Sequence, residues 1–88
     1  MNRTDILHTA QQYITKDRAG VHGDATDNFR RIARLWSEYL EADISETDVA
    51  VLMTLLKVAR IKSNAANDDN WIDACGYMAL GGELSNGR

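Results

Sequence analysis

The sequence predicts an all-α fold, a compact antiparallel bundle of about four helices. Three observations predict it: proline is absent, apolar residues recur every three or four positions in several segments, and residues that can cap helices precede those segments. Apolar and polar residues nowhere alternate over a length that would suit a strand. We therefore expect a single helical domain over residues 1–84 and a flexible C-terminal tail over residues 85–88.

The first two predicted helices each carry one apolar face. The first should span residues 4–17, with Thr4 or Asp5 as its N-cap, and the second should span residues 24–40, with Asp24 as the cap of a capping-box pattern. The residues expected to face the core are Ile6, Leu7, Ala10, Tyr13 and Ile14 in the first helix, and Phe29, Ile32, Ala33, Trp36, Tyr39 and Leu40 in the second. The opposite faces should meet solvent.

The third predicted helix, over residues 45–62, is the candidate central helix because apolar residues surround most of its circumference. Ser45 and Asp48 form a capping-box pattern at its start. Its expected inward arc contains Val49, Leu52, Met53, Leu56 and Ala59. Arg60 falls inside this arc, and burying an unpaired guanidinium would cost roughly several kcal/mol. Arg60 should therefore have an anionic partner.

The fourth predicted helix follows a short polar loop and spans residues 68–84. The residues expected to point inward are Trp71, Cys75, Met78 and Gly82. The helix is also rich in small residues, namely Ala74, Gly76, Ala79, Gly81 and Gly82. Such residues permit the close approach of another helix or of a flat ligand.

Length and composition restrict the classes of function. A chain of 88 residues buries only about 60% of the surface that it exposes when unfolded, so we expect further burial in a homo-oligomer. The formal charge of −3 disfavours a nucleic-acid partner. Cys75 is the single cysteine, which predicts a reduced, buried thiol. No apolar stretch approaches the roughly 18 residues of a membrane span, so we expect no membrane partner and a cytoplasmic location.

Cations and acids gather on the third and fourth predicted helices. Lys57 and Arg60 precede the loop, and Asp69 and Asp73 follow it on one helical face, with Asn70 and Tyr77 beside them. The two carboxylates have the spacing to hold a divalent ion, or to accept hydrogen bonds from Lys57 and Arg60. Asp69 is also placed to cap its helix, which leaves Asp73 unexplained. The pattern predicts a charged pocket or a structural ion pair.

A second candidate lies where a glycine-containing turn meets the second helix. His22 and Asp24 flank Gly23, and the free backbone amides at a helix start can receive phosphate or carboxylate oxygens. His22 could hydrogen-bond a ribose or a base edge, and Asn28 and Arg31 lie near enough to the apolar stripe to reach a pocket. The alternative is a tight turn in which His22 is solvated and Asp24 is only a cap.

Several short motifs together carry a resemblance to a known family. They are His22-Gly23-Asp24, Asn28-Phe29, Ile32-Ala33, Leu35-Trp36, Tyr39-Leu40, Asp48-Val49-Ala50, the run from Leu55 to Arg60, the run from Asp69 to Ala74, and Gly76-Tyr77. With these motifs the chain resembles a family of small phage and prophage proteins of unassigned function, over about residues 16–84. This resemblance implies that the protein acts inside a host cell during phage infection.

The chain also resembles, more distantly, the all-α nucleoside triphosphate pyrophosphohydrolases of the MazG type. That resemblance implies carboxylates that hold magnesium on a pyrophosphate, from a Glu-x-x-Glu pair and an acid-x-x-Asp motif. Here Asn70 and Asp73 stand at the second motif, so an amide replaces one acid. Glu38 and Glu41 have the spacing of the first motif but point away from the apolar stripe. These departures favour binding over hydrolysis.

The resulting hypothesis is a phage-encoded anti-defence protein that sequesters a nucleotide messenger of host antiviral defence, of the cyclic dinucleotide or cyclic ADP-ribose type. Lys57 and Arg60 would neutralise its phosphates. The predicted ligand-binding residues are His22, Asp24, Asn28, Arg31, Lys57, Arg60, Asp69, Asn70, Asp73 and Tyr77, with no catalytic residue and no metal ligand. The first alternative is a MazG-like hydrolase, which alone would need Mg²⁺ as a cofactor. The second is a helical module that inhibits a host protein. The expected partners are a nucleotide-like small molecule and a second copy of the chain, in the host cytoplasm.

Overall fold

The computed structural model describes residues 1–17 and 24–86. Its elements are α1 (Arg3–Gln12), the π-helical segment η1 (Tyr13–Asp17), α3 (Ala25–Leu40), α4 (Glu46–Ser63) and α5 (Asp68–Ser85). The described residues contain no strand, so the all-α prediction is confirmed. The last helix includes Ser85, which the sequence assigned to the tail, and Asn86 is its C-cap. The expected single domain and flexible tail stay predictions.

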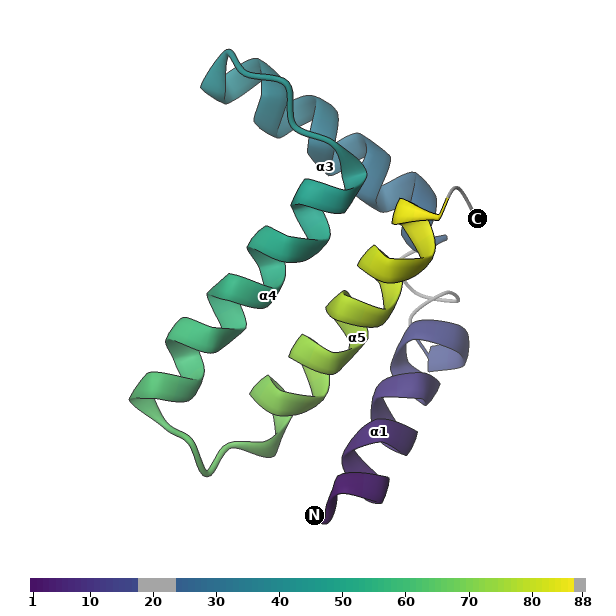
Figure 1. Cartoon of the computed structure of the whole chain (residues 1–88), viewed down its shortest axis with the longest axis vertical. Coiled ribbons are helices and arrows are strands. Elements are labelled where there is room, and N and C mark those ends of the chain that lie inside the picture. The colour runs from purple at the N-terminus through teal and green to yellow at the C-terminus, as the bar shows by residue number, and fades with distance from the viewer. Residues whose placement is uncertain (18–23, 87–88) are drawn as a thin grey trace.

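Helices α4 and α5 are joined by the short loop 64–67 and lie side by side in opposite directions (Figure 1). Helix α1 lies on the other side of α5 and runs in the same direction as α5 (Figure 1). The amino group of Met1 accordingly lies 3.7 Å from the carboxylate of Asp68 at the start of α5. Helix α3 crosses the end of the α4–α5 pair (Figure 1). The expected all-antiparallel arrangement is therefore found for α4 and α5 but not for α1.

Short polar side chains begin the helices. Asp24 is the predicted N-cap of α3 and accepts a hydrogen bond from the Asp27 amide, and Ser45 forms with Asp48 the complete capping box that the sequence predicts. At α1 the prediction of Thr4 or Asp5 as the cap is wrong. The cap is Asn2, whose side chain accepts from the amide of Asp5 while the Asp5 carboxylate accepts from the amide of Asn2. Asparagine is as good an N-cap as aspartate, because its carbonyl oxygen accepts the same bond.

The core lies where α3 crosses the start of α4. Its buried cluster consists of Phe29, Ala33, Val49 and Ala50. Ile32, Trp36, Met53, Tyr77, Leu80 and Leu84 pack against this cluster while half-buried. Ile72 is also almost fully buried, and Ala10 of α1 is buried as well. The core is thus built largely from small and medium side chains, which allow the helices to approach closely.

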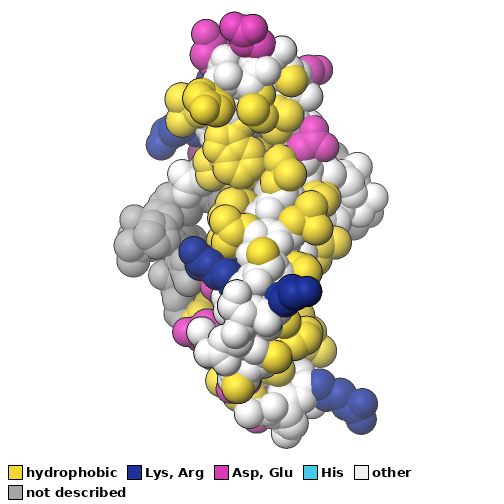
Figure 2. Space-filling model, turned by 90° about the vertical axis from the view of Figure 1, so that its left-hand side faces the viewer, with side chains coloured by type: hydrophobic (Ala, Val, Ile, Leu, Met, Phe, Trp, Pro, Cys, Tyr) yellow, Lys and Arg dark blue, Asp and Glu magenta, His cyan; other side chains and the backbone are white. Residues whose placement is uncertain are grey.

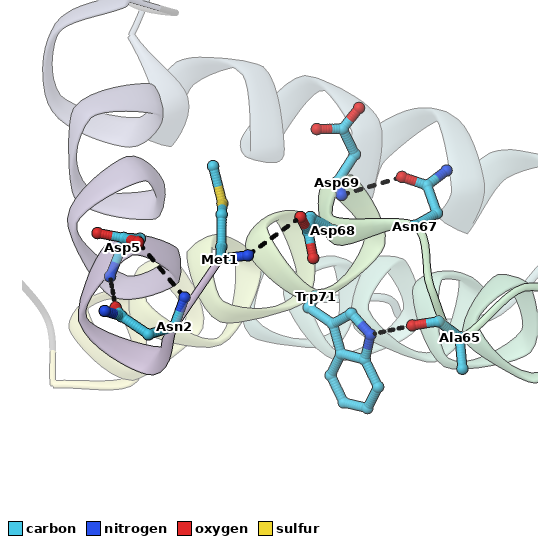
Figure 3. Close-up of polar contacts among 8 residues, drawn as sticks. All are labelled: Met1, Asn2, Asp5, Ala65, Asn67, Asp68, Asp69 and Trp71. Carbon is cyan, nitrogen blue, oxygen red and sulfur yellow. Dashed lines mark hydrogen bonds and ion pairs between the residues drawn. The ribbon is translucent and has the colours of Figure 1, made fainter.

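Several residues expected to face the core are exposed: Leu7, Tyr39, Leu40, Leu52, Leu56, Trp71 and Met78. The indole N–H of Trp71 donates to the Ala65 carbonyl oxygen at 2.9 Å, which places this ring against the α4–α5 loop (Figure 3). Gly82 is also exposed, with no neighbouring atom near the position that a Cβ would occupy. Cys75 is a free cysteine that is only half-buried. The inward face expected for α4 is about a quarter-turn from the face that is buried, and the one expected for α5 is nearly opposite the buried face.

Two glycines of α5 set how closely its neighbours approach. A Cβ built on Gly81 would lie 2.8 Å from the Cβ of Ala50 in α4, and one on Gly76 would lie 3.0 Å from the Cγ2 of Ile14 in η1. Real Cβ atoms essentially never make the shorter of these contacts. The predicted use of small residues for close packing is therefore confirmed at Gly76 and Gly81, but not at Gly82.

Candidate ligand-binding groove

A buried ion pair joins α4 and α5. The Nζ of Lys57 lies 2.9 Å from Oδ2 of Asp73, and the two side chains are only 11% and 19% exposed. Lys57 is two helical turns beyond Ala50, so it lies on the inward face of α4 where an apolar residue would be usual. Removing both charges from water is costly, and their direct contact offsets that cost. The pair therefore fixes the Asp73 carboxylate in one position.

Asp73 also lines a groove of about 650 Å³ between η1 and the end of α1, α3 and α5. This volume lies in the range of small-molecule sites. Four other residues that the sequence singled out line the same groove: Asp24, Asn28, Arg31 and Tyr77. Apolar side chains, among them Phe29, Ile32, Leu35 and Ile72, form much of the remaining wall.

Helical spacing brings these residues together. On α3, Asn28, Arg31 and Leu35 follow one another at intervals of three and four residues and so share a face. On α5, Asp73, Tyr77 and Leu80 do the same. The Tyr77 ring packs against Phe29 with centroids 6.2 Å apart and a tilt of 34° between the planes, which couples the two faces.

The charge of the groove differs from the expected cationic pocket. Arg31 is the one basic side chain among the described residues that line it, and the acidic ones are Asp24, Asp73 and Glu83. Lys57 reaches Asp73 without lining the groove, so it compensates the Asp73 charge from within the protein. Such a groove suits hydroxyl, amino or amide groups with one anionic group at Arg31, rather than a chain of phosphates.

The remaining predicted site residues lie elsewhere. Arg60 is exposed in the last turn of α4, so its predicted burial is wrong. A cation there is favourable because the carbonyl end of a helix carries partial negative charge. Asn70 is buried at 7% exposure but does not line the groove. His22 lies outside the described residues.

Asp69 belongs to the start of α5. Its backbone amide donates to Oδ1 of Asn67 at 3.0 Å, and its exposed carboxylate points away from the other residues drawn in Figure 3. The helix cap is thus Asn67, one residue before the expected start. Asp69 is therefore a first-turn acid whose charge suits the helix dipole, and it is not brought to the groove.

Sequence reasoning missed several residues of the groove. Glu83 follows Leu80 by three residues, so extending the spacing of Asp73, Tyr77 and Leu80 by one more step would have found it. Tyr13, Ile14 and Thr15 come from η1. Their presence follows from the parallel placement of α1 beside α5, for which the sequence carries no local signal.

A second depression of about 580 Å³ lies at the corner between α3 and α4. Two of its charged side chains pair at the surface, since Nε of Arg30 lies 3.2 Å from Oε1 of Glu46. Exposed pairs of this kind are weak and salt-screened. The depression therefore offers no fixed group comparable to Asp73.

The described residues include no group of three or more His, Cys, Asp or Glu side chains placed to hold a metal ion. Glu38 and Glu41, which the distant resemblance would use as ligands, are exposed, as expected from the helical pattern.

Within the part of the chain that the structure covers, no helix is long and apolar enough to cross a membrane.

Comparison with known proteins identifies the family of this chain. A family described as a domain of unknown function, DUF6378, matches residues 5–85. The chain belongs to this family. The DUF6378 chain is 44% identical to the Gene 55 protein of Mycobacterium phage L5 over 76 residues, which are 85% of the chain and 49% of that protein. It is also 44% identical to the Gene 55 protein of Mycobacterium phage D29 over 72 residues, which are 82% of the chain and 48% of that protein.

These DUF6378 findings confirm the resemblance to small phage proteins of unassigned function. The chain spans about half the length of the curated relatives that it matches. No solved structure matches it. The resemblance to MazG-type pyrophosphohydrolases stays a prediction, as do the cytoplasmic location and the homo-oligomer.

Proposed function

We propose that this phage protein binds a small nucleotide-like molecule in the groove between η1, α3 and α5, and that it does so without hydrolysing it. The observation that carries the proposal is the Asp73 carboxylate, held at 2.9 Å by the buried Lys57 and facing a groove of about 650 Å³. A fixed acceptor in a mostly apolar wall is the arrangement by which binding sites orient a ligand.

Asp73 and Asn28 would form hydrogen bonds with the nucleoside part of the ligand. A carboxylate accepts hydrogen bonds from ribose hydroxyls or from an exocyclic amino group, and an asparagine amide both donates and accepts. Because Lys57 already holds one oxygen of Asp73, the carboxylate keeps its orientation before the ligand arrives. The binding free energy is then not spent on ordering this side chain.

Arg31 would receive the anionic part. Lys57 and Arg60, which the sequence suggests as phosphate contacts, do not line the groove, because Lys57 is paired with Asp73 and Arg60 is exposed elsewhere on α4. With Arg31 as the single lining cation among the described residues, a ligand of low charge density fits better than a free triphosphate. A cyclic nucleotide, whose phosphates are diesters, meets this requirement.

The same ion pair favours retention over turnover. In the MazG-type resemblance Asp73 would be a metal ligand, but here its charge is compensated by Lys57. A magnesium ion at the other carboxylate oxygen would lie close to that ammonium group and be repelled by it. A phage protein that retains a nucleotide could sequester a messenger of host antiviral defence, and this use remains part of the proposal.

The test is to incubate the purified chain with nucleoside triphosphates, cyclic dinucleotides and cyclic ADP-ribose isomers, with and without magnesium. The protein is then separated, denatured and analysed for released nucleotide. Recovery of an intact cyclic nucleotide supports the proposal. Release of monophosphate and pyrophosphate would establish the hydrolase instead, and retention of none of these compounds would contradict binding.

Arg31→Ala and Arg34→Ala form a matched pair for this assay. Both arginines are exposed on α3, but only Arg31 lines the groove. Loss of a charge-assisted hydrogen bond should weaken retention by about 10-fold or more in Arg31→Ala. Arg34→Ala should retain the nucleotide as the unmodified chain does, and equal losses in both variants would point to non-specific charge effects.

A further inference from the structure

The outward face of α4 exposes a continuous apolar stripe. Val51, Leu52, Leu55 and Val58 are between 40% and 55% exposed, although they are large aliphatic residues in the middle of an 18-residue helix. Figure 2 shows hydrophobic side chains gathered along this side of the molecule, with basic side chains set among them in its lower half. Monomeric proteins seldom expose a continuous apolar stripe of this kind.

The stripe is symmetric about Leu55. Its members lie at −7, −4, −3, 0, +3, +4 and +7 relative to that residue, which are the positions of one helical face. They are Asp48, Val51, Leu52, Leu55, Val58, Ala59 and Lys62, all exposed. A two-fold axis through Leu55 would therefore place Val51 opposite Ala59, and Leu52 opposite Val58, of a second copy.

The two ends of the stripe carry opposite charges. Asp48 stands at the start of α4 and Lys62 in its last turn, each seven residues from Leu55. In an antiparallel pair of α4 helices, Asp48 of each copy meets Lys62 of the other, so two ion pairs bracket the apolar centre. In a parallel pair like charges would face each other. Asp48 also closes the capping box with Ser45, and its second oxygen can serve the second copy.

We propose that the outward face of α4 is a homodimer interface, in which two copies pack antiparallel about Leu55. The proposal does not depend on ligand binding, because no residue of the stripe lines the groove. One helix face per copy lies near the lower end of specific interface sizes, so the dissociation constant should be about 1–100 μM.

Sedimentation equilibrium of the chain, from about 1 to 300 μM, tests this range. The average mass should rise from 9.8 kDa toward twice that value. Leu55→Glu places two carboxylates at the two-fold axis and should weaken the dimer about 100-fold or more, while helicity and the melting temperature of the dilute protein stay unchanged.

The matched control is Leu7→Glu, the same substitution at a leucine that is 62% exposed on α1, and it should leave the dimer intact. A chain that remains monomeric over the whole range would overturn the proposal and leave the face to a different partner. A dimer that persists in Leu55→Glu would overturn it too.

Cysteine cross-linking, in a Cys75→Ala background, tests the orientation. Leu55→Cys should form an intermolecular disulfide under mild oxidation because the two residues face each other. Lys62→Cys should not, since its copies would lie about 21 Å apart along the helix axes. If Lys62→Cys cross-links as readily as Leu55→Cys, the helices are parallel and the proposed antiparallel interface is wrong.

Discussion

The two faces of α4 each depart from the usual distribution of polar and apolar side chains. The inward face buries Val49, Ala50 and the charged Lys57, whereas the outward face exposes Leu52 and Leu55. The inward face is determined by what α5 offers, which is Gly81 opposite Ala50 and Asp73 opposite Lys57. Burial on this helix is therefore decided by its neighbour rather than by the hydrophobicity of its own residues.

The difference between the two faces of α4 suggests a different function for each. The inward face supports the groove, because Lys57 holds Asp73 in position at its wall. The aliphatic residues of the outward face are exposed, so they are available for a second copy. One helix would thus serve ligand binding on one side and self-association on the other.

Removal of one charge from the inward face should have the largest effect on stability. Asp73→Ala leaves the Lys57 ammonium without its partner in a largely buried place, which should lower the free energy of unfolding by about 3–5 kcal/mol. Urea denaturation monitored by circular dichroism measures this change.

The double variant Lys57→Met with Asp73→Leu tests whether the unpaired charge causes this loss of stability. Two apolar side chains of similar size avoid the uncompensated charge, so the double variant should recover at least about half of the lost stability. If its loss equals the sum of the losses in Lys57→Met and in Asp73→Leu alone, Lys57 and Asp73 act independently and the ion pair is not the cause.

A second comparison trims one aliphatic residue on each face. Val49 is fully buried, so Val49→Ala should cost about 2 kcal/mol of unfolding free energy through lost burial and a small cavity. Leu52→Ala, on the exposed face, should cost less than about 1 kcal/mol in dilute protein. A larger loss at Leu52 than at Val49 would reverse the assignment of the faces.

Alanine substitutions at the two adjacent glycines of α5 should have effects of opposite sign. Gly81→Ala pushes a methyl group against Ala50 and should destabilise the chain by about 1–3 kcal/mol. Gly82→Ala meets open space and should stabilise it by about 0.5–1 kcal/mol, because alanine loses less backbone entropy in a helix. Thermal melting of both variants should show a decrease and an increase, and equal shifts would be inconsistent with the α4–α5 contact at Gly81.

Local signals predicted the helices but not their mutual rotation. Ser45 and Asp48 mark the start of α4 within four residues of sequence, and that capping box is found. Which residue of α4 faces Asp73 depends instead on the register between two helices. From the sequence, both Lys57 and Arg60 are candidate partners of Asp73. They lie only three residues apart on α4, yet Lys57 is buried against Asp73 and Arg60 is exposed.

The groove was also predictable only in part. Asn28, Arg31, Asp73 and Tyr77 were singled out from their positions on helical faces, and all four line it. The contribution of Tyr13 was not predictable, because nothing in the sequence of α1 specifies that it packs parallel to α5. The charge of the groove was not predictable from the sequence either, because Lys57 pairs with Asp73 without lining the groove.

The contrast between the two faces of α4 is tested most directly by comparing Lys57→Ala and Leu55→Glu in urea unfolding at low micromolar protein concentration. Removing a charge from the inward face should lower the free energy of unfolding by about 3 kcal/mol, whereas adding a charge to the outward face should change it by less than about 0.5 kcal/mol. A loss in Leu55→Glu that equals or exceeds the loss in Lys57→Ala would contradict the account.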